Sequence, residues 1–283
     1  MAPTSLTRRS FLALSATLPL ALKAHAYASA SIPVGLELYS VRHQLQQDLD
    51  GTVLAVAKMG YQGVEFYAPY FDWSENQTKQ IRKLLDDQGV RCFSTHNSFE
   101  YFAPENLQKA RDRNLILGSK YVVMSSSKPK PGLDGWKEVA GILNSAADTL
   151  EPARLKAGYH NHELEFTPLD GTRPIEILAK NTKPSIMLQL DVGTCIEAGS
   201  DPVAWIKANP GRIRSLHCKD WAPGDSKGYT VLFGEGVADW KAIFAAAESA
   251  GGVEYYLVEQ EGSRFSEMDT ARMCLQTFRK MRA

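Results

Sequence analysis

The sequence has few cysteines, no excess of charge of either sign and no apolar run of membrane-spanning length. Four cysteines in 283 residues, with no short-range pairing pattern, exclude a disulfide-dense scaffold. Lysines and arginines number 32, as do aspartates and glutamates, so nothing favours a nucleic-acid or membrane-surface partner. Hydrophobic residues make up 44%, which excludes a disordered chain. Apolar, strand-like surroundings predict buried thiols: Cys92, Cys195, Cys218 and Cys274.

The first 30 residues have the pattern of an export signal. Arg8 and Arg9 precede an apolar run at 11–22, and small-residue sites follow at 24–26 and 28–30. This order is typical of a cleaved signal, and the run is shorter than the ~20 residues of a membrane span. We therefore expect no stable membrane insertion.

The hexapeptide "TRRSFL" resembles the twin-arginine signal of bacteria, and Lys23 after the apolar run suits that route. We predict a twin-arginine signal peptide at 1–30 and a periplasmic or secreted protein; a Sec signal or an uncleaved anchor is the alternative. Removal of residues 1–26 would leave 29 basic and 32 acidic residues, a net charge near −3. Twin-arginine export carries folded proteins, which fits a metal enzyme without disulfides.

From residue 33 onward, short apolar runs alternate with helical patterns. The apolar runs predict strands at 34–39, 63–67, 91–95, 121–125, 157–160, 186–191, 213–218 and 255–259. Stretches with a period of 3.6 residues predict helices between them, among others at 49–59, 77–88, 104–117, 136–156 and 240–250. Glycines are expected to end several helices, at Gly60, Gly89, Gly158 and Gly251.

Eight strand–helix units predict a closed (β/α)8 TIM barrel as a single domain at 31–283. An open doubly wound sheet is the alternative, but it needs a glycine-rich phosphate turn after its first strand. The segment "YSVRHQL", which follows the first predicted strand, has no glycine.

Ionisable side chains collect where the predicted strands end, which is where barrels of this kind build their active sites. Four of the five histidines after residue 30 lie there. Singly, such an aspartate often caps a helix and such a histidine often lies in the core. Together, His, Asp, His and Glu on four strand ends indicate one divalent transition metal (Mn, Co, Zn or Fe) with mixed nitrogen and oxygen ligands. The same charges buried without a metal would be costly.

Six segments resemble the xylose isomerase-like barrel superfamily, the sugar phosphate isomerase/epimerase group: "GYQGVEFY", "GYHNHELEF", "LQLDVGTCIEAG", "LHCKDW", "GEGVADW" and "YYLVEQE". The resemblance runs along the whole chain after the signal. It implies metal ligands at strands five to eight, which by position are His160, Asp191, His217 and Glu259. Most members carry a glutamate where this sequence has His160, so either His160 or Glu165 is the strand-five ligand.

The resemblance also implies proton abstraction next to a carbonyl, through a metal-stabilised enediolate. Glu259 would be one catalytic group, with His162 or Glu165 facing it, and Lys219 would stabilise an oxyanion or protonate a leaving group. The expected substrate-binding residues are Tyr39, Glu65, His96 and, on the loop at 234–240, Glu235.

Three functions remain open. The first is a sugar isomerase or epimerase acting on a free or oxidised (keto) sugar. The second is a lyase or dehydratase, because the "YHNH" form resembles inosose dehydratases and 3-keto-glycoside lyase-hydratases; an oxidoreductase would then supply the keto-sugar. The third is a non-catalytic sugar-binding protein. A DNA-repair nuclease like endonuclease IV is disfavoured, because the mature chain is slightly acidic and carries an export signal.

Overall fold

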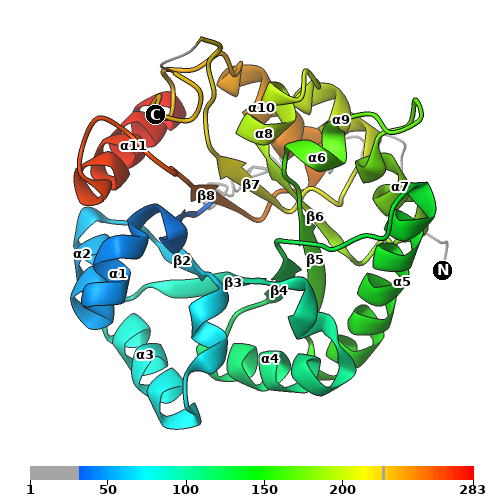
Figure 1. Ribbon diagram of the computed structural model, residues 1–283. Helices are drawn as coiled ribbons and strands as arrows, with labels where there is room; N and C mark the ends of the chain where they lie inside the picture. Colours follow the sequence, from blue (N-terminus) through cyan, green and yellow to red (C-terminus); the bar gives the residue numbers. More distant parts are fainter. Residues whose placement is uncertain (1–31, 225–226) are drawn as a thin grey trace, which may run out of the picture. The chain divides into compact units, whose positions relative to one another are not determined.

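The computed structural model describes residues 32–224 and 227–283, which form a closed barrel of parallel strands. The predicted export signal at 1–30 lies outside the described residues and stays a prediction. Figure 1 looks along the barrel, with the helices in a ring around the strands. The strands follow one another around the barrel in sequence order, β1 to β8, and β1 closes on β8 through the pair Leu36 and Val258. The predicted single (β/α)8 barrel is confirmed.

The predicted strands are confirmed, with small shifts at their ends. Their bounds are β1 Val34–Glu37, β2 Gly63–Phe66, β3 Arg91–Asn97, β4 Tyr121–Met124, β5 Lys156–His160, β6 Met187–Asp191, β7 Ser215–Cys218 and β8 Tyr255–Val258. The third strand extends two residues past its prediction, to Asn97. All four cysteines are free and buried, as expected.

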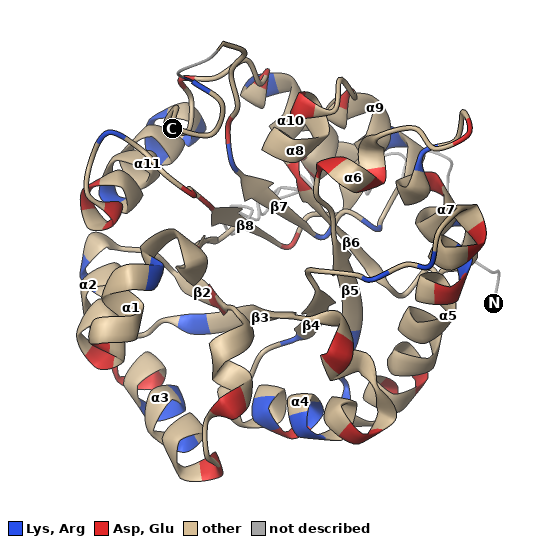
Figure 2. Ribbon diagram, viewed as in Figure 1, with Lys and Arg blue, Asp and Glu red and all other residues tan. Residues whose placement is uncertain are grey.

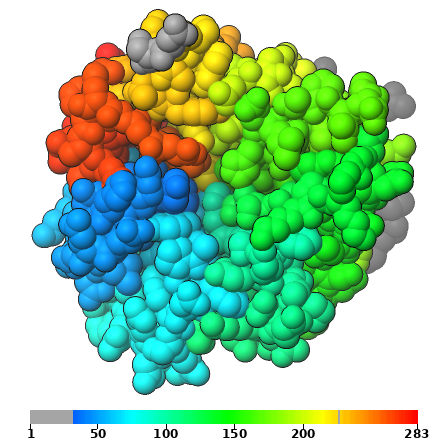
Figure 3. All heavy atoms as spheres, viewed as in Figure 1, coloured from blue at the N-terminus to red at the C-terminus, as the bar shows by residue number. Residues whose placement is uncertain are grey.

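The outer ring is built of helices of very different lengths. The bounds are α1 Arg42–Gln47, α2 Leu49–Met59, α3 Glu75–Asp87, α4 Pro104–Leu117, α5 Leu133–Leu150, α6 Glu163–Phe166, α7 Pro174–Asn181, α8 Val192–Glu197, α9 Pro202–Ala208, α10 Trp240–Ala246 and α11 Glu267–Arg282. Figure 2 shows both signs of charge interspersed over these helices, and the space-filling view in Figure 3 shows all the coloured segments meeting around the middle of this face. Among the described residues, we find no helix with the length and apolar character needed to cross a membrane.

The carboxyl-terminal bound of one predicted helix is wrong, as are two of the glycines expected to end helices. The helix expected at 136–156 ends at Leu150, because a short 3-10 turn containing Pro152 follows and the chain then reverses at Arg154, with φ of 59°. Gly158, expected to end that helix, lies inside β5. Gly251 lies within a π turn, and its neighbour Gly252 takes the left-handed conformation that ends it, with φ of 78°.

The barrel interior has an apolar floor beneath a polar layer. The floor is a separate cluster of buried side chains: Phe93, Tyr121, Val123, Met187, Tyr255 and Leu257. Phe93 fits because β1 and β2 carry glycines beside it. A β-carbon on Gly63 would lie 2.3 Å from the Phe93 ring, and one on Gly35 would lie 3.0 Å from it. Side chains alternate along a strand, so Asp191, four residues after Met187, and Glu259, two residues after Leu257, also point inward.

We expect Gly63→Ala to lower the free energy of unfolding by about 1–3 kcal/mol, because the added methyl overpacks the floor against Phe93. Gly141 is an exposed residue inside α5 with nothing within 4 Å of its missing β-carbon. The control Gly141→Ala should therefore raise that free energy by about 0.5–1 kcal/mol. Urea unfolding followed by circular dichroism measures both changes, and equal effects of the two substitutions would contradict the floor packing.

Candidate functional site

The polar layer consists of seven buried side chains, namely Glu37, Glu65, His96, His160, Asp191, His217 and Glu259. Each comes from the carboxyl-terminal half of a different strand or directly follows that strand. Several of the inward residues stand above an apolar or small one on the same strand, as Glu259 stands above Leu257 and His160 above Gly158. Within the described residues, three groups of side chains have ligand atoms within 4.8 Å of one another. They are His160, Asp191 and Glu259; His96, His160 and His217; and Glu37, Glu65 and His96. All these side chains are buried, and they are consistent with a divalent metal site.

His217 lies between two buried carboxylates. Its Nδ1 is 2.5 Å from Glu259 Oε2, and its Nε2 is 2.9 Å from Glu65 Oε1. Burial by itself lowers the pKa of His217, but the charges of Glu259 and Glu65 outweigh it and raise that pKa to about 9. The two carboxylates therefore fix the plane of the imidazole ring.

His160 has the opposite electrostatic environment. Burial and the neighbouring imidazoles of His217 and His96 hold its pKa well below the usual range. Its Nδ1 is 3.1 Å from Gln189 Oε1, and its Nε2 is 3.9 Å from Asp191 Oδ2. A neutral imidazole keeps a lone pair free, which a metal ligand requires.

Gln189 is a member of the site that the sequence analysis missed. Its amide oxygen also lies 2.8 Å from His96 Nε2, and its amide nitrogen donates to Glu65 Oε2 at 2.9 Å. One sequence feature could have identified Gln189: in "LQLD" it stands two residues before Asp191 and therefore on the same face of β6.

Lys219 is a buried cation that lies against carboxylates of the polar layer. Its Nζ is 3.2 Å from Asp191 Oδ2 and 3.9 Å from Glu259 Oε1, and it also pairs with Glu261. Burial lowers the pKa of Lys219, but these carboxylates outweigh it and raise that pKa well above its usual value. Lys219 therefore carries a proton beside the Asp191 carboxylate.

Asp220, the neighbouring residue, has a structural role instead. Its carboxylate accepts hydrogen bonds from the backbone N–H of Gly234 at 2.9 Å and from Trp240 Nε1 at 2.8 Å. These hydrogen bonds hold the segment at 234–240 ("GEGVADW") beside the end of β7.

Glu165 is turned away from the three groups. It accepts a hydrogen bond from the Tyr159 hydroxyl at 2.6 Å and another from the His162 backbone N–H at 2.8 Å, and so caps α6. Glu165 is not a member of any group that the described residues form. His162 is exposed, with its ring centroid 5.1 Å from that of His160.

The four expected substrate-binding residues occupy different places. Glu65 and His96 lie inside the buried cluster, 3.0 Å apart from Oε1 to Nε2. Tyr39 is 39% exposed and makes an edge contact with Tyr67. Glu235 is exposed and pairs with Arg264 through contacts of 2.8 and 3.0 Å.

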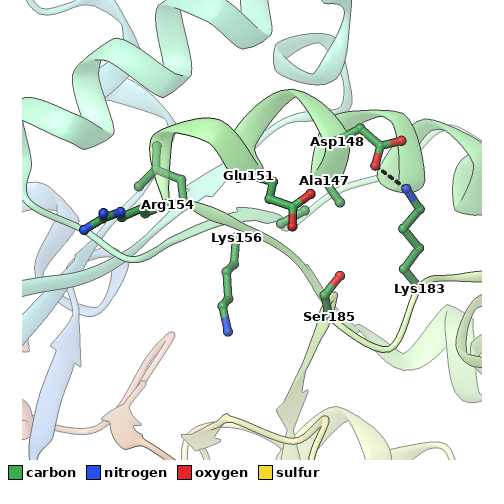
Figure 4. Close-up of a pocket in the computed structure, with 9 residues that line it drawn as sticks. Ala147, Asp148, Glu151, Arg154, Lys156, Lys183 and Ser185 are labelled. Atoms are coloured by element: carbon green, nitrogen blue, oxygen red, sulfur yellow. Dashed lines mark hydrogen bonds and ion pairs between the residues drawn. The ribbon is translucent and has the colours of Figure 1, made fainter.

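A separate hollow lies at the amino-terminal end of β5, away from the cluster (Figure 4). It is bordered by charged side chains from α5 and the segments around β5 and β6, and there Lys183 pairs with Asp148. None of the histidines of the polar layer lines it. Barrels of this kind build active sites at the other end, so this hollow is not a candidate substrate site.

A family model described as xylose isomerase-like TIM barrel matches residues 53–281. The chain belongs to this family. An inosose dehydratase of Geobacillus thermodenitrificans (strain NG80-2) is 25% identical over 244 residues, 73% of this chain and 80% of the relative. The L-ribulose-5-phosphate 3-epimerase UlaE of Salmonella paratyphi C (strain RKS4594) is 36% identical over 213 residues, 66% of this chain and 71% of the relative.

The solved structure of a sugar phosphate isomerase/epimerase from Parabacteroides distasonis ATCC 8503 superposes with a TM-score of 0.72 at 29% identity, covering 88% of this chain and 94% of that one. The xylose isomerase-like relatives thus include isomerases, epimerases and dehydratases.

We expect Lys219→Met to lower the free energy of unfolding of the metal-free protein by about 3–5 kcal/mol, because Asp191 and Glu259 would lose their buried cation. The matched control is Lys183→Met, which removes a partly exposed pair with Asp148 and should cost less than ~1 kcal/mol. Urea unfolding in the presence of a chelator measures both values. A loss at Lys219 no larger than that at Lys183 would show that the cluster does not depend on this charge.

Proposed function

We propose that the protein is a divalent-metal-dependent enzyme that abstracts a proton next to the carbonyl of a free or oxidised sugar, giving isomerisation or epimerisation. The observation that carries the proposal is the buried group of His160, Asp191 and Glu259 with the Lys219 ammonium against it. Membership in the xylose isomerase-like family supports the sugar substrate.

The donor set fits a transition metal. His160, Asp191 and Glu259 would hold the ion, since they bring an imidazole nitrogen and carboxylate oxygens within 4.8 Å of one another. His217, the fourth expected ligand, would join them by giving up one of its hydrogen bonds to Glu259 or Glu65. Glu165 does not fit this role, because both of its oxygens already accept hydrogen bonds that hold α6. When bound, the metal would act as a Lewis acid on the substrate oxygens.

The protein side chains would move the proton. We take the exposed His162 imidazole, next to His160, as the group that would accept a proton from a substrate carbon, and Glu259 would face it from the end of β8. Lys219 would donate to the oxygen that gains negative charge, while Asp191 and Glu261 hold its ammonium in place. Return of the proton to carbon completes an isomerisation or epimerisation.

Elimination is the second candidate function. The same proton abstraction yields an unsaturated ketone if a β-oxygen leaves, and Lys219 would then protonate that leaving group. The relative named inosose dehydratase supports this reading, since its name states the loss of water from a keto-cyclitol. A sugar-binding protein without activity is the remaining alternative.

We expect His160 to be a ligand of a Mn²⁺, Co²⁺ or Zn²⁺ ion in the mature protein, and Glu165 not to be one. His160→Ala should weaken the affinity at least ~10-fold, because a ligand is lost, whereas Glu165→Gln should change it by less than ~3-fold. Isothermal titration of chelator-stripped protein measures both. Retention by His160→Ala with loss in Glu165→Gln would reverse the assignment, and failure of the wild type to bind any of the three ions would refute the metal enzyme.

A keto-sugar incubated with the metal-loaded protein in D₂O should gain deuterium at the carbon next to the carbonyl. His162→Ala should slow this exchange about 10²–10⁴-fold, because the general base is lost. The exposed residue Lys130, paired with Glu138 on α5, supplies the control Lys130→Met. Proton NMR reads the exchange and separates an epimer from an unsaturated ketone. Exchange that is equal in His162→Ala and wild type would exclude this histidine as the base.

A further inference from the structure

A second set of metal-type ligands lies on the other side of the polar layer, formed by Glu37, Glu65 and His96 from β1, β2 and β3. The two glutamates are fully buried, and His96 is 7% exposed. The separation of 3.0 Å between Glu65 Oε1 and His96 Nε2 matches that of two ligands on one ion, which is about 3–3.5 Å for metal–ligand bonds of ~2.1 Å.

Glu37 has an oxygen that lacks a partner. Its Oε1 is 3.4 Å from the Tyr39 backbone nitrogen and 3.9 Å from His96 Nδ1. Its Oε2 is buried and has no hydrogen-bond partner among the described residues. A proton on this oxygen would find no acceptor there, and leaving it unpaired is costly. A cation would satisfy the lone pair directly.

The pairing of the buried carboxylates points the same way. Glu65 lies against the imidazoles of His217 and His96, Asp191 against the Lys219 ammonium, and Glu259 against His217. Among the described residues, the cationic group that lies near Glu37 is His96, whose Nδ1 is 3.9 Å from Glu37 Oε1. An unpaired buried carboxylate is expensive, so Glu37 is the carboxylate that a second cation would satisfy.

We propose that the cluster is binuclear, with a second divalent transition-metal ion held by Glu37, Glu65 and His96. The His96 ring is 4.5 Å from that of His160 and 5.1 Å from that of His217, centroid to centroid, so the two sites adjoin through these imidazoles. The inference deepens the proposed function and rests on it for the first ion alone. Adjoining ions would hold two neighbouring oxygens of one substrate, which favours hydroxyketones over simple carbonyl compounds.

The test is Mn²⁺ stoichiometry combined with electron paramagnetic resonance on chelator-stripped mature protein. After equilibrium dialysis, the wild type should retain two Mn²⁺ per chain and give the multiline signal of an exchange-coupled pair. Glu37→Gln should retain one Mn²⁺ and give the six-line signal of an isolated ion. The control Glu138→Gln, which alters an exposed carboxylate on α5, should behave as the wild type.

The outcomes separate this inference from the proposed function. One Mn²⁺ per chain with an isolated-ion signal in the wild type would overturn the binuclear centre and leave the metal enzyme standing. Two Mn²⁺ per chain in Glu37→Gln would also overturn it, because the second ion would then lie elsewhere. A wild type without bound Mn²⁺ would overturn both. If Glu37→Gln does not fold, the coupled signal of the wild type decides.

Discussion

Compensation of buried negative charge is the constraint on which the interior of this protein depends. Four carboxylates stand inside the barrel, where an isolated charge is strongly disfavoured. Lys219 neutralises part of this charge from β7, and His217 bridges Glu259 and Glu65 with both ring nitrogens. The buried histidines and carboxylates that this arrangement brings together are consistent with a divalent metal site.

The apolar floor makes this polar layer possible. Parallel strands of a barrel send alternate side chains inward, and the lower layer is filled by aromatic and aliphatic groups such as Phe93 and Tyr255. Gly35 and Gly63 leave the volume that Phe93 occupies. The packed floor closes the interior below the carboxylates, while His162 and Tyr39, each two residues after a member of the polar layer, are exposed.

In the function that we propose, the same cluster would serve isomerisation, epimerisation and elimination up to a shared step. Each begins with removal of a proton next to a carbonyl, and each needs a cationic donor near the oxygen. What separates them is the fate of the β-substituent, which depends on the substrate and on the segments at the rim rather than on His160, Asp191 or Glu259.

The sequence by itself determined the strand order, the barrel and most of the polar layer, because alternating apolar runs and ionisable strand ends are local patterns. It left His160 and Glu165 as equal candidates for strand five, and it missed Gln189. Tertiary contacts bear on both residues: the Tyr159 hydroxyl donates a hydrogen bond to Glu165, and the amide of Gln189 meets imidazoles from two other strands. Such contacts join residues far apart in the chain or depend on side-chain direction, and neither is written in a local pattern.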